Sequence, residues 1–381
     1  MPSRWGNLHW VMSGANEEWP KWGFNACVRM VKPWTEWLFY FMPAPWAEPA
    51  YNPSQKKVLE RIVEVIGDAS ITSKDIQIKD VSKWVINEVV AERYHDGNDV
   101  FCLGDAVHRH PPVNGLGSNT CIQDAYNLAW KIALVEQGKA DPSLLDSYTV
   151  ERQPVGATVI GRANQGLRDH GPIWDAIGRK GATLAERQAA WAELSEGSER
   201  GTLRRESLRK AVEWTSHALM AVGVEMNQQY DSRAVYLADE VLRPSLPEDP
   251  ILHYQITTYP GSRLPHAWLN TKNPGRQFST QDLAGKSRFC LLTGHGGRPW
   301  KEALEKVGQE LGIETVSYGI GWGLDYEDVY SDWTRRREVR DAGCVLVRPD
   351  RFVAWRSMDM LDDCADKLRT VLSHILGRGP Q

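Results

Sequence analysis

The sequence lacks the features that mark metal-binding, disulfide-bonded, membrane-spanning or nucleic-acid-binding proteins. Its six cysteines among 381 residues form no CxxC pair and no metal-ligand spacing, which indicates a reducing compartment and no zinc. No apolar run is long enough to cross a bilayer, and Trp5–Glu18 is too polar for a signal peptide. A net charge of −4 gives no electrostatic footprint for nucleic acid. We therefore expect a cytoplasmic protein without a metal, membrane or nucleic-acid partner.

A dinucleotide-binding fingerprint is also missing. Gly115 and Gly117 have the spacing of its first two glycines, but the loop before them is too long for a Rossmann turn, and Thr120 replaces the third small residue. The glycines of Gly319–Gly323 have the wrong spacing. We therefore predict no GxGxxG turn, and so no pyrophosphate site of that kind, in this sequence.

The most informative stretch is Val100–Trp130. Val100–Leu103 is an apolar run of strand type, Gly104–Gly117 is a loop rich in glycine and proline, and a helix is predicted from Ser118 to about Gln137. Ser118 or Asn119 is expected as the N-cap, and Gly138 as a left-handed C-terminal residue. Apolar residues at helical spacing predict one buried face, formed by Ile122, Tyr126, Ala129, Trp130, Ala133 and Leu134.

The chemistry of this stretch suggests a ligand. Glycines let a ligand approach the main chain, and the start of a helix presents unpaired amides and the positive end of the helix dipole. An electron-rich group would be stabilised there. The carboxylate of Asp105 suits the hydroxyls of a sugar or polyol rather than a phosphate. The alternative is an irregular loop before a well-capped helix, with no ligand.

Three runs carry a family resemblance: Gly104-Asp105, then His108-Arg109-His110-Pro111-Pro112, then Gly115-Leu116-Gly117-Ser118-Asn119. In this order they resemble the second flavin motif of the FAD-dependent aromatic hydroxylases, above all the phenol and chlorophenol monooxygenase branch. Val31–Trp37, Tyr148–Pro154 and Gln228–Val235 resemble the same branch, although the role of the last segment does not follow from its sequence.

The resemblance implies roles for several residues. Asp105 would hold the ribityl chain of FAD, the carbonyl of Pro112 would lie beside the flavin, and the helix start would face its pyrimidine end. The resemblance thus implies a cofactor site at Asp105, Pro112, Gly115, Gly117, Ser118 and Asn119. His110 is a candidate for contact with the substrate ring or the flavin, and His108 could equally be a buried side chain bonded to a backbone carbonyl. Trp37 is a candidate substrate contact or a packed sheet residue.

The remaining chain predicts a mixed α/β (α+β) protein. Strands are expected at Leu8–Met12, Ala26–Val31, Glu36–Met42 and within Asp75–Glu92, where Val81, Trp84 and Ile86 are candidates for burial. A proline-rich connection is expected at Pro43–Pro53, and helices at Ser54–Ile66 and from Pro142 to about Ala221. The pair Glu151–Arg152 is interpreted as a local salt bridge or a tie between domains.

The C-terminal third shows the order strand, helix, strand, hairpin and helix. These elements are expected at Arg288–Thr293, Pro299–Leu311, Glu314–Ile320, Gly343–Arg356 and Asp359–Leu376. This order indicates a thioredoxin-like fold, but Gly294–Gly297 carries no cysteine, so no thiol chemistry follows. We predict three domains: 1–95, a substrate-domain sheet; 96–250, the second FAD motif and a helical region; and 251–381, the thioredoxin-like domain.

Two functions remain open at this point. The resemblance implies an FAD-dependent monooxygenase that hydroxylates a phenolic or other aromatic substrate with NAD(P)H and O2, with a homodimer as the candidate assembly. Full members of the family open with a GxGxxG half that binds the FAD pyrophosphate, and that half is expected to be absent here. The alternative is therefore a truncated, non-catalytic homologue that dimerises or binds an aromatic ligand. The sequence identifies no catalytic residue, no particular phenol, and no preference for NADH or NADPH.

Overall fold

The computed structural model describes residues 8–12, 25–42, 52–97, 99–179 and 183–378. The chain forms two compact units: residues 1–85 with 170–213, and residues 86–169 with 214–381. Helices and short strands are mixed in both, as predicted for an α/β protein. Within the described ranges, no helix is both long and apolar enough to cross a membrane. The predicted connection Pro43–Pro53 lies almost wholly outside the described residues.

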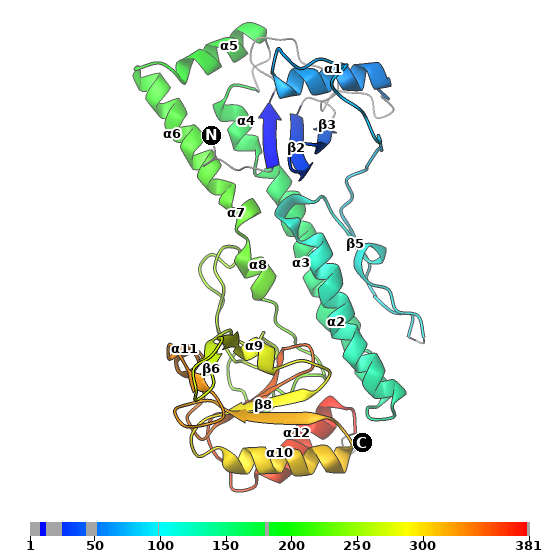
Figure 1. Ribbon diagram of the computed structural model, residues 1–381, viewed down its shortest axis with the longest axis vertical. Coiled ribbons are helices and arrows are strands. Elements are labelled where there is room, and N and C mark those ends of the chain that lie inside the picture. Colours follow the sequence, from blue (N-terminus) through cyan, green and yellow to red (C-terminus); the bar gives the residue numbers. More distant parts are fainter. Residues whose placement is uncertain (1–7, 13–24, 43–51, 98, 180–182, 379–381) are drawn as a thin grey trace. The chain divides into compact units, whose positions relative to one another are not determined.

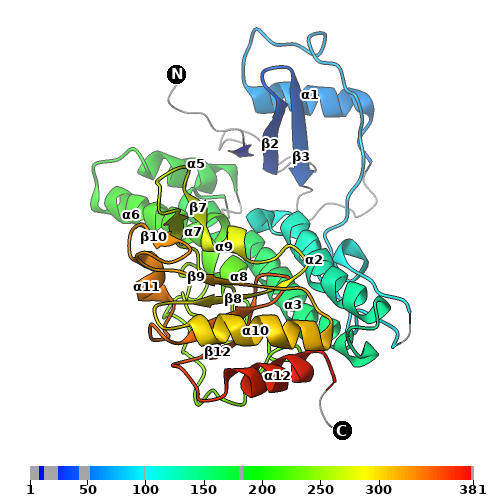
Figure 2. The same cartoon turned by 60° about the horizontal axis from the view of Figure 1, so that its bottom comes forward.

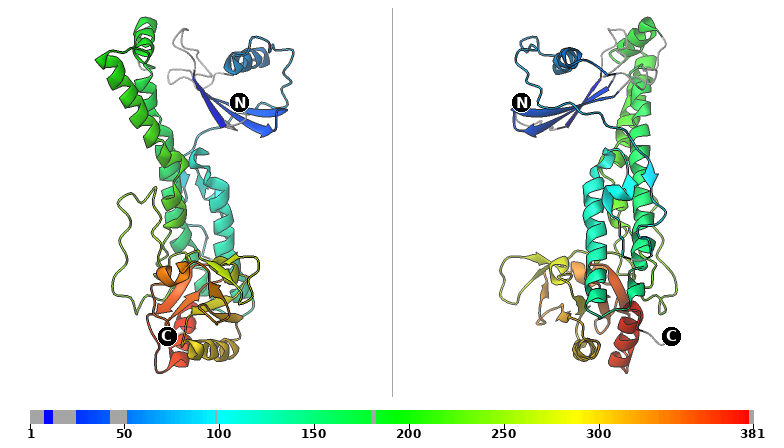
Figure 3. Two further views of the ribbon diagram at one scale, coloured as in Figure 1. Left: turned by 60° about the vertical axis from the view of Figure 1, so that its left-hand side comes forward. Right: turned by 90° about the vertical axis from the view of Figure 1, so that its right-hand side faces the viewer.

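The first unit contains an antiparallel sheet of three strands, β1 (Leu8–Met12), β2 (Asn25–Lys32) and β3 (Glu36–Met42), in that order. Figure 3 shows them side by side. All three were predicted. Helix α1 (Gln55–Ile66) follows, with Ser54 as its N-cap and left-handed Gly67 at its end. This unit also contains α4 (Gly171–Ala176), α5 (Leu184–Glu193) and most of α6 (Glu199–Trp214).

The predicted strand within Asp75–Glu92 is wrong for most of its length. Only β4 (Val89–Val90) is extended and paired, with β5 (His108–Arg109). Val81 and Trp84 are 59% and 58% exposed, and Ile86 is exposed as well, so these candidates for burial are also wrong. Apolar alternation alone does not make a strand, because a strand also needs a neighbour to satisfy its backbone.

Two long helices dominate the first part of the second unit. Helices α2 (Gly117–Glu136) and α3 (Ser147–Arg168) lie side by side, joined through the short 3-10 helix η3 (Pro142–Leu144) (Figure 1). Two further 3-10 turns, η1 (Gly104–Ala106) and η2 (Val113–Gly115), precede α2. Short helices α7 (Ser216–Leu219) and α8 (Val222–Met226) come later in the chain.

The C-terminal layer has a four-stranded sheet in the order β12-β11-β8-β9. Strands β8 (Phe289–Thr293) and β9 (Thr315–Gly319) are parallel, whereas β11 (Cys344–Val347) is antiparallel to β8 and to β12 (Val353–Ser357). Helices α10 (Arg298–Leu311) and α12 (Cys364–Ile375) pack against each other on one face (Figure 2). The predicted order of elements is therefore present, and the name thioredoxin-like stays a prediction.

A smaller sheet and two short helices complete this layer. Its strands β6 (Trp268–Asn270), β7 (Phe278–Ser279) and β10 (Glu327–Asp328) have the order β10-β6-β7. Helix α9 (Thr280–Leu283) follows β7, and helix α11 (Asp332–Arg336) follows β10. The three-domain division predicted from the sequence stays a prediction.

The main core joins α2 to the C-terminal layer. Every residue of β8 is buried, as the continuous apolar run predicts. Trp130 and Leu134 of α2 belong to the same cluster of buried side chains as the helices α10 and α12, and Trp130 meets Phe289 edge-on at 5.9 Å between ring centroids. Burial of these aromatic rings fixes the C-terminal half of α2 within its unit.

Candidate functional site

The Gly104–Asp105 pair lies in a turn, not at the end of a strand. Gly104 begins η1 with a φ of 61°, and a Cβ there would lie 2.8 Å from Cys121 Sγ on α2. The predicted strand Val100–Leu103 is wrong, because only an isolated bridge between Phe101 and His95 forms there. Glycine is thus required at position 104 both by its backbone and by its close approach to α2.

Asp105 is exposed, and its carboxylate accepts no hydrogen bond from the residues that the structure describes. Its main chain is held instead, because Arg109 Nε donates to the Asp105 carbonyl at 2.8 Å. Arg109 is thus an anchor of this loop. The side chain of Asp105 is left with acceptors available to a hydroxyl-bearing ligand.

Helix α2 begins without a side-chain cap. It starts at Gly117, and Leu116 occupies the N-cap position, where its apolar side chain cannot accept a hydrogen bond. The predicted caps Ser118 and Asn119 are wrong, since both lie inside the first turn. Asn119 Nδ2 donates to the Gly115 carbonyl at 3.3 Å instead. The first-turn amides and the positive helix end therefore lack the side-chain acceptor that a capped helix provides.

The loop before α2 is open around its glycines. Gly115 has a φ of 65°, and a Cβ there would meet no atom within 4 Å. Pro112 is exposed, and its carbonyl accepts from the Gly115 amide at 3.2 Å. The half-buried ring of His110 borders Gly117, where an added Cβ would lie 3.5 Å from it, while its Nδ1 is 2.8 Å from the Pro111 carbonyl. His110 thus borders the helix entrance that the sequence predicts as a flavin site.

A buried carboxylate on α2 lies beneath this loop. Asp124 Oδ2 accepts from the Gly104 amide at 3.1 Å and from His108 Nε2 at 2.8 Å, and Asp124 Oδ1 accepts from Arg152 Nε at 2.7 Å. Burial acts to raise the pKa of Asp124, but the hydrogen bond from His108 and the charge of Arg152 outweigh it and lower that pKa. His108 is therefore a buried residue bonded to a carboxylate, not to a backbone carbonyl.

A second buried group connects α2 and α3 with the C-terminal layer. The carboxylate of Glu151 accepts from Lys131 Nζ at 2.8 Å, from Asn127 Nδ2 at 2.6 Å, and from both terminal nitrogens of Arg348 at 2.5 and 2.8 Å. Arg348 also bonds to Asp350. All five side chains are buried. The pair Glu151–Arg152 is thus not an exposed local salt bridge; Glu151 ties α3 to the β11–β12 hairpin.

The segment Gln228–Val235 gains a role from these two groups. Arg152 Nη1 donates to Gln228 Oε1 at 3.1 Å and to Tyr230 Oη at 2.9 Å. Ser232 Oγ donates to Glu151 at 2.6 Å. This segment therefore supplies two acceptors to Arg152 and one donor to Glu151, and so completes both buried charge clusters.

Two family models match the chain: the FAD binding domain over residues 8–163, and the aromatic-ring hydroxylase C-terminal domain over residues 257–379. The chain is 44% identical over 359 residues to 2,4-dichlorophenol 6-monooxygenase of Cupriavidus pinatubonensis. It is 40% identical over 357 residues to phenol 2-monooxygenase of a Pseudomonas species. The chain therefore contains an FAD binding domain and the C-terminal domain of the aromatic-ring hydroxylases. The resemblance inferred from the sequence motifs is confirmed.

A solved structure supports this hydroxylase fold. The flavin-dependent monooxygenase PieE, determined in complex with FAD and substrate, shares 37% identity with this chain at a TM-score of 0.85. The match covers 98% of this chain and 62% of PieE. The two curated relatives are likewise covered over 58% and 57% of their own length, so the chain spans about three fifths of the proteins that it matches.

The predicted site residues of this chain fall into two groups. Asp105, Pro112 and the helix start Gly117–Asn119 come together around one loop of the second unit, with His110 beside them. Trp37 lies in β3 of the first unit, where it is exposed and pairs with Met30, and its role in substrate contact stays a prediction.

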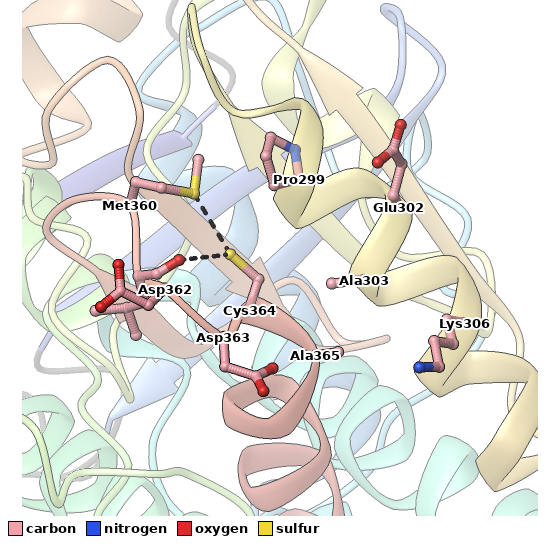
Figure 4. A pocket seen from close by; sticks show the side chains of 10 residues that line it. Pro299, Glu302, Ala303, Lys306, Met360, Asp362, Asp363, Cys364 and Ala365 are labelled. Carbon is pink, nitrogen blue, oxygen red and sulfur yellow. Dashed lines mark hydrogen bonds between the residues drawn. The ribbon is translucent and has the colours of Figure 1, made fainter.

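A hollow of about 400 Å³ lies in the C-terminal layer, away from the predicted flavin residues (Figure 4). Charged side chains such as Glu302, Lys306 and Asp362 line it, together with the buried Cys364, whose Sγ lies 3.4 Å from Met360 Sδ. Its lining contains no aromatic ring. In the described part of the chain, no cluster of three or more His, Cys, Asp or Glu side chains could hold a metal ion.

Proposed function

We propose that this protein works as an FAD-dependent monooxygenase that hydroxylates a phenolic or other aromatic substrate with NAD(P)H and O2. The names of its relatives support the reaction class, because a chlorophenol monooxygenase and a phenol monooxygenase are among them. The PieE structure, which contains FAD and substrate, supports the cofactor. Since the chain spans only part of these proteins, the activity of the whole enzyme is a proposal here.

The uncapped start of α2 beside Asp105 carries this proposal. A flavin has a polyhydroxyl chain and a ring that becomes negative when it is reduced. The exposed carboxylate of Asp105 can accept from the hydroxyls, and the first-turn amides with the helix dipole can stabilise the negative ring. The open space at Gly115 permits close approach to the main chain. The residues present therefore fit FAD.

The protein would contribute positioning and electrostatics, while the bound flavin would supply the redox chemistry. In this proposal Asp105 holds the ribityl chain, and Gly117, Ser118 and Asn119 direct their amides to the ring. Pro112 offers its carbonyl at the exposed edge of the loop. His110 borders the same entrance and is the nearest candidate for a contact with the flavin or the substrate ring. Trp37 remains a second candidate for the substrate ring.

The proposal also includes partners and location. We expect a small aromatic molecule as the only required substrate besides NAD(P)H and O2, and a homodimer as the assembly. We expect the cytoplasm as the location. The curated relatives named above are monooxygenases, so they give no support to the non-catalytic alternative.

Flavin binding and substrate-dependent turnover test the proposal. Purified protein should bind added FAD and show a perturbed flavin absorbance band. It should then oxidise NADH or NADPH faster when phenol or a chlorophenol is present, and form a hydroxylated product. A protein that rejects FAD, or one that shows no aromatic-dependent oxidation of either nicotinamide, would contradict the proposal.

A further inference from the structure

The carboxylate of Asp124 joins the turn of Asp105 to both long helices of its unit. Asp124 lies on α2, two turns after the uncapped start of the helix. One of its oxygens holds the Gly104 amide and His108 Nε2, and the other holds Arg152 Nε on α3. Asp124 and Arg152 are completely buried and His108 is almost so. Water therefore cannot replace these partners of the Asp124 carboxylate.

The position of Asp105 depends on its backbone, because its own carboxylate has no partner among the described residues. The residue before it, Gly104, receives its fixed place from Asp124 and from the close contact with Cys121. On the other side, Val107 donates to the Gly104 carbonyl at 2.9 Å, which closes the turn. Asp124 is therefore the side chain that attaches this turn to α2.

We propose that Asp124 is a positioning residue. Through its hydrogen bond to the Gly104 amide, it holds the carboxylate of Asp105 beside the start of α2, so that a polyol-bearing cofactor can contact both the carboxylate and the helix start. The inference rests on the proposed FAD site. It goes beyond it, because Asp124 itself is buried and does not touch the ligand.

His108 has a clear place in this arrangement. Its Nε2–H donates to Asp124, while its ring packs near Tyr94 at 6.2 Å between ring centroids and against Gly156. Its neighbour Arg109 pairs through β5 with β4 and anchors the Asp105 carbonyl. The same carboxylate therefore fixes both ends of the segment Gly104–His108.

The test replaces Asp124 with asparagine, which keeps the size but offers one acceptor oxygen to three donors. The first readout is hydrogen exchange of the Gly104 amide in protein without FAD. We expect exchange at least about tenfold faster, the order expected when a hydrogen bond to a charged group is lost. The second readout is the dissociation constant of FAD. It should rise about tenfold or more, as is typical when a residue that orients a ligand-binding group is replaced.

Glu151→Gln is the matched control. Glu151 is an equally buried carboxylate in an ion pair, but it does not touch the loop Gly104–His108. We expect it to lower stability and to leave both the Gly104 exchange and the FAD dissociation constant unchanged. An unchanged FAD dissociation constant in Asp124→Asn would overturn the inference, and so would an equal weakening in both variants.

If Asp124→Asn does not fold, Asp124→Glu keeps the charge and displaces the carboxylate by one methylene. It should also weaken FAD binding, and unchanged affinity would contradict the inference. Failure of the proposed function has a different signature. In that case the wild-type protein would reject FAD, whereas the Gly104 amide would still exchange faster in Asp124→Asn than in the wild type.

Discussion

The buried charge cluster around Glu151 yields the sharpest stability prediction. Replacing Glu151 with glutamine removes the negative charge that Arg348 and Lys131 share, and leaves Arg348 with Asp350 as its bonded carboxylate. All of these groups are buried, so water cannot replace the lost partner. Breaking one side of a buried ion pair costs about 3–5 kcal/mol, a large part of the about 5–15 kcal/mol by which domains are stable.

The assay is urea unfolding followed by circular dichroism, with Glu302→Gln as the control. Glu302 accepts from Arg298 Nε at 2.7 Å, but both side chains are exposed, so this ion pair should be worth less than about 1 kcal/mol. The free energy of unfolding should therefore fall by about 3–5 kcal/mol in Glu151→Gln and barely change in the control. Equal small losses in both variants would refute the view that Glu151 ties α3 to the C-terminal layer.

Four further predictions concern the same unit. Asp105→Asn should raise the FAD dissociation constant at least about tenfold in a fluorescence titration, because a charged acceptor for hydroxyls is lost; unchanged binding would remove Asp105 from the site. Gly104→Ala should lower the free energy of unfolding by about 1–3 kcal/mol, because the backbone at position 104 is left-handed and an added Cβ would clash with Cys121. Adding Cys121→Ala should recover part of that loss in the same urea assay. Burial, and next the charge of Arg348, lower the pKa of Lys131 from 10.5 to about 8, although the charge of Glu151 opposes this shift. Between these two pH values the unfolded chain binds more protons than the folded chain, so the wild type should gain stability relative to Lys131→Met as pH rises from about 8 to about 10.5. A stability difference between the two proteins that stays constant over this pH range would contradict the prediction. Tyr94→Phe should leave unfolding unchanged or raise its free energy by up to about 1 kcal/mol, because the buried hydroxyl has no partner among the described residues, and a larger loss would reveal one.

Local signals in the sequence predicted much of the fold. Ser54 and Gly67 mark the ends of α1, and Gly138, with a φ of 65°, follows α2 as predicted. The apolar run of β8 and the hairpin of β11 and β12 also lie where the pattern placed them. These features depend on a few neighbouring residues, so a single sequence contains the information that they need.

The buried face of α2 could not be predicted in this way. Ile122 is 66% exposed, whereas Asp124, Asn127 and Lys131 are buried at helical spacing. The predicted burial is therefore wrong for Ile122, Tyr126, Ala129 and Ala133, which are exposed, and is confirmed only for Trp130 and Leu134. The partners that make burial of these polar groups favourable lie far along the chain, and Arg348 is 197 residues from Glu151.

The candidate flavin residues were predicted from motif resemblance, but the buried residues that hold their loop in place were not. Asp105, His110 and Gly117 stand out because glycines, prolines and histidines gather in one short loop. Asp124 and Arg152 stand out only once the two helices are placed side by side, since each has an ordinary local sequence. A polar residue repeated on one helix face, as at positions 120, 124, 127 and 131, is the signal that could have revealed them.

One measurement tests the central claim most directly: titration of FAD into the purified protein, followed by absorbance and by the quenching of flavin fluorescence, for the wild type and Asp105→Asn. The uncapped start of α2 and the exposed Asp105 predict saturable binding with a shifted flavin band in the wild type. They predict binding at least about tenfold weaker in the variant. Absence of saturable binding in the wild type, or identical binding by the two proteins, would contradict the proposed flavin site.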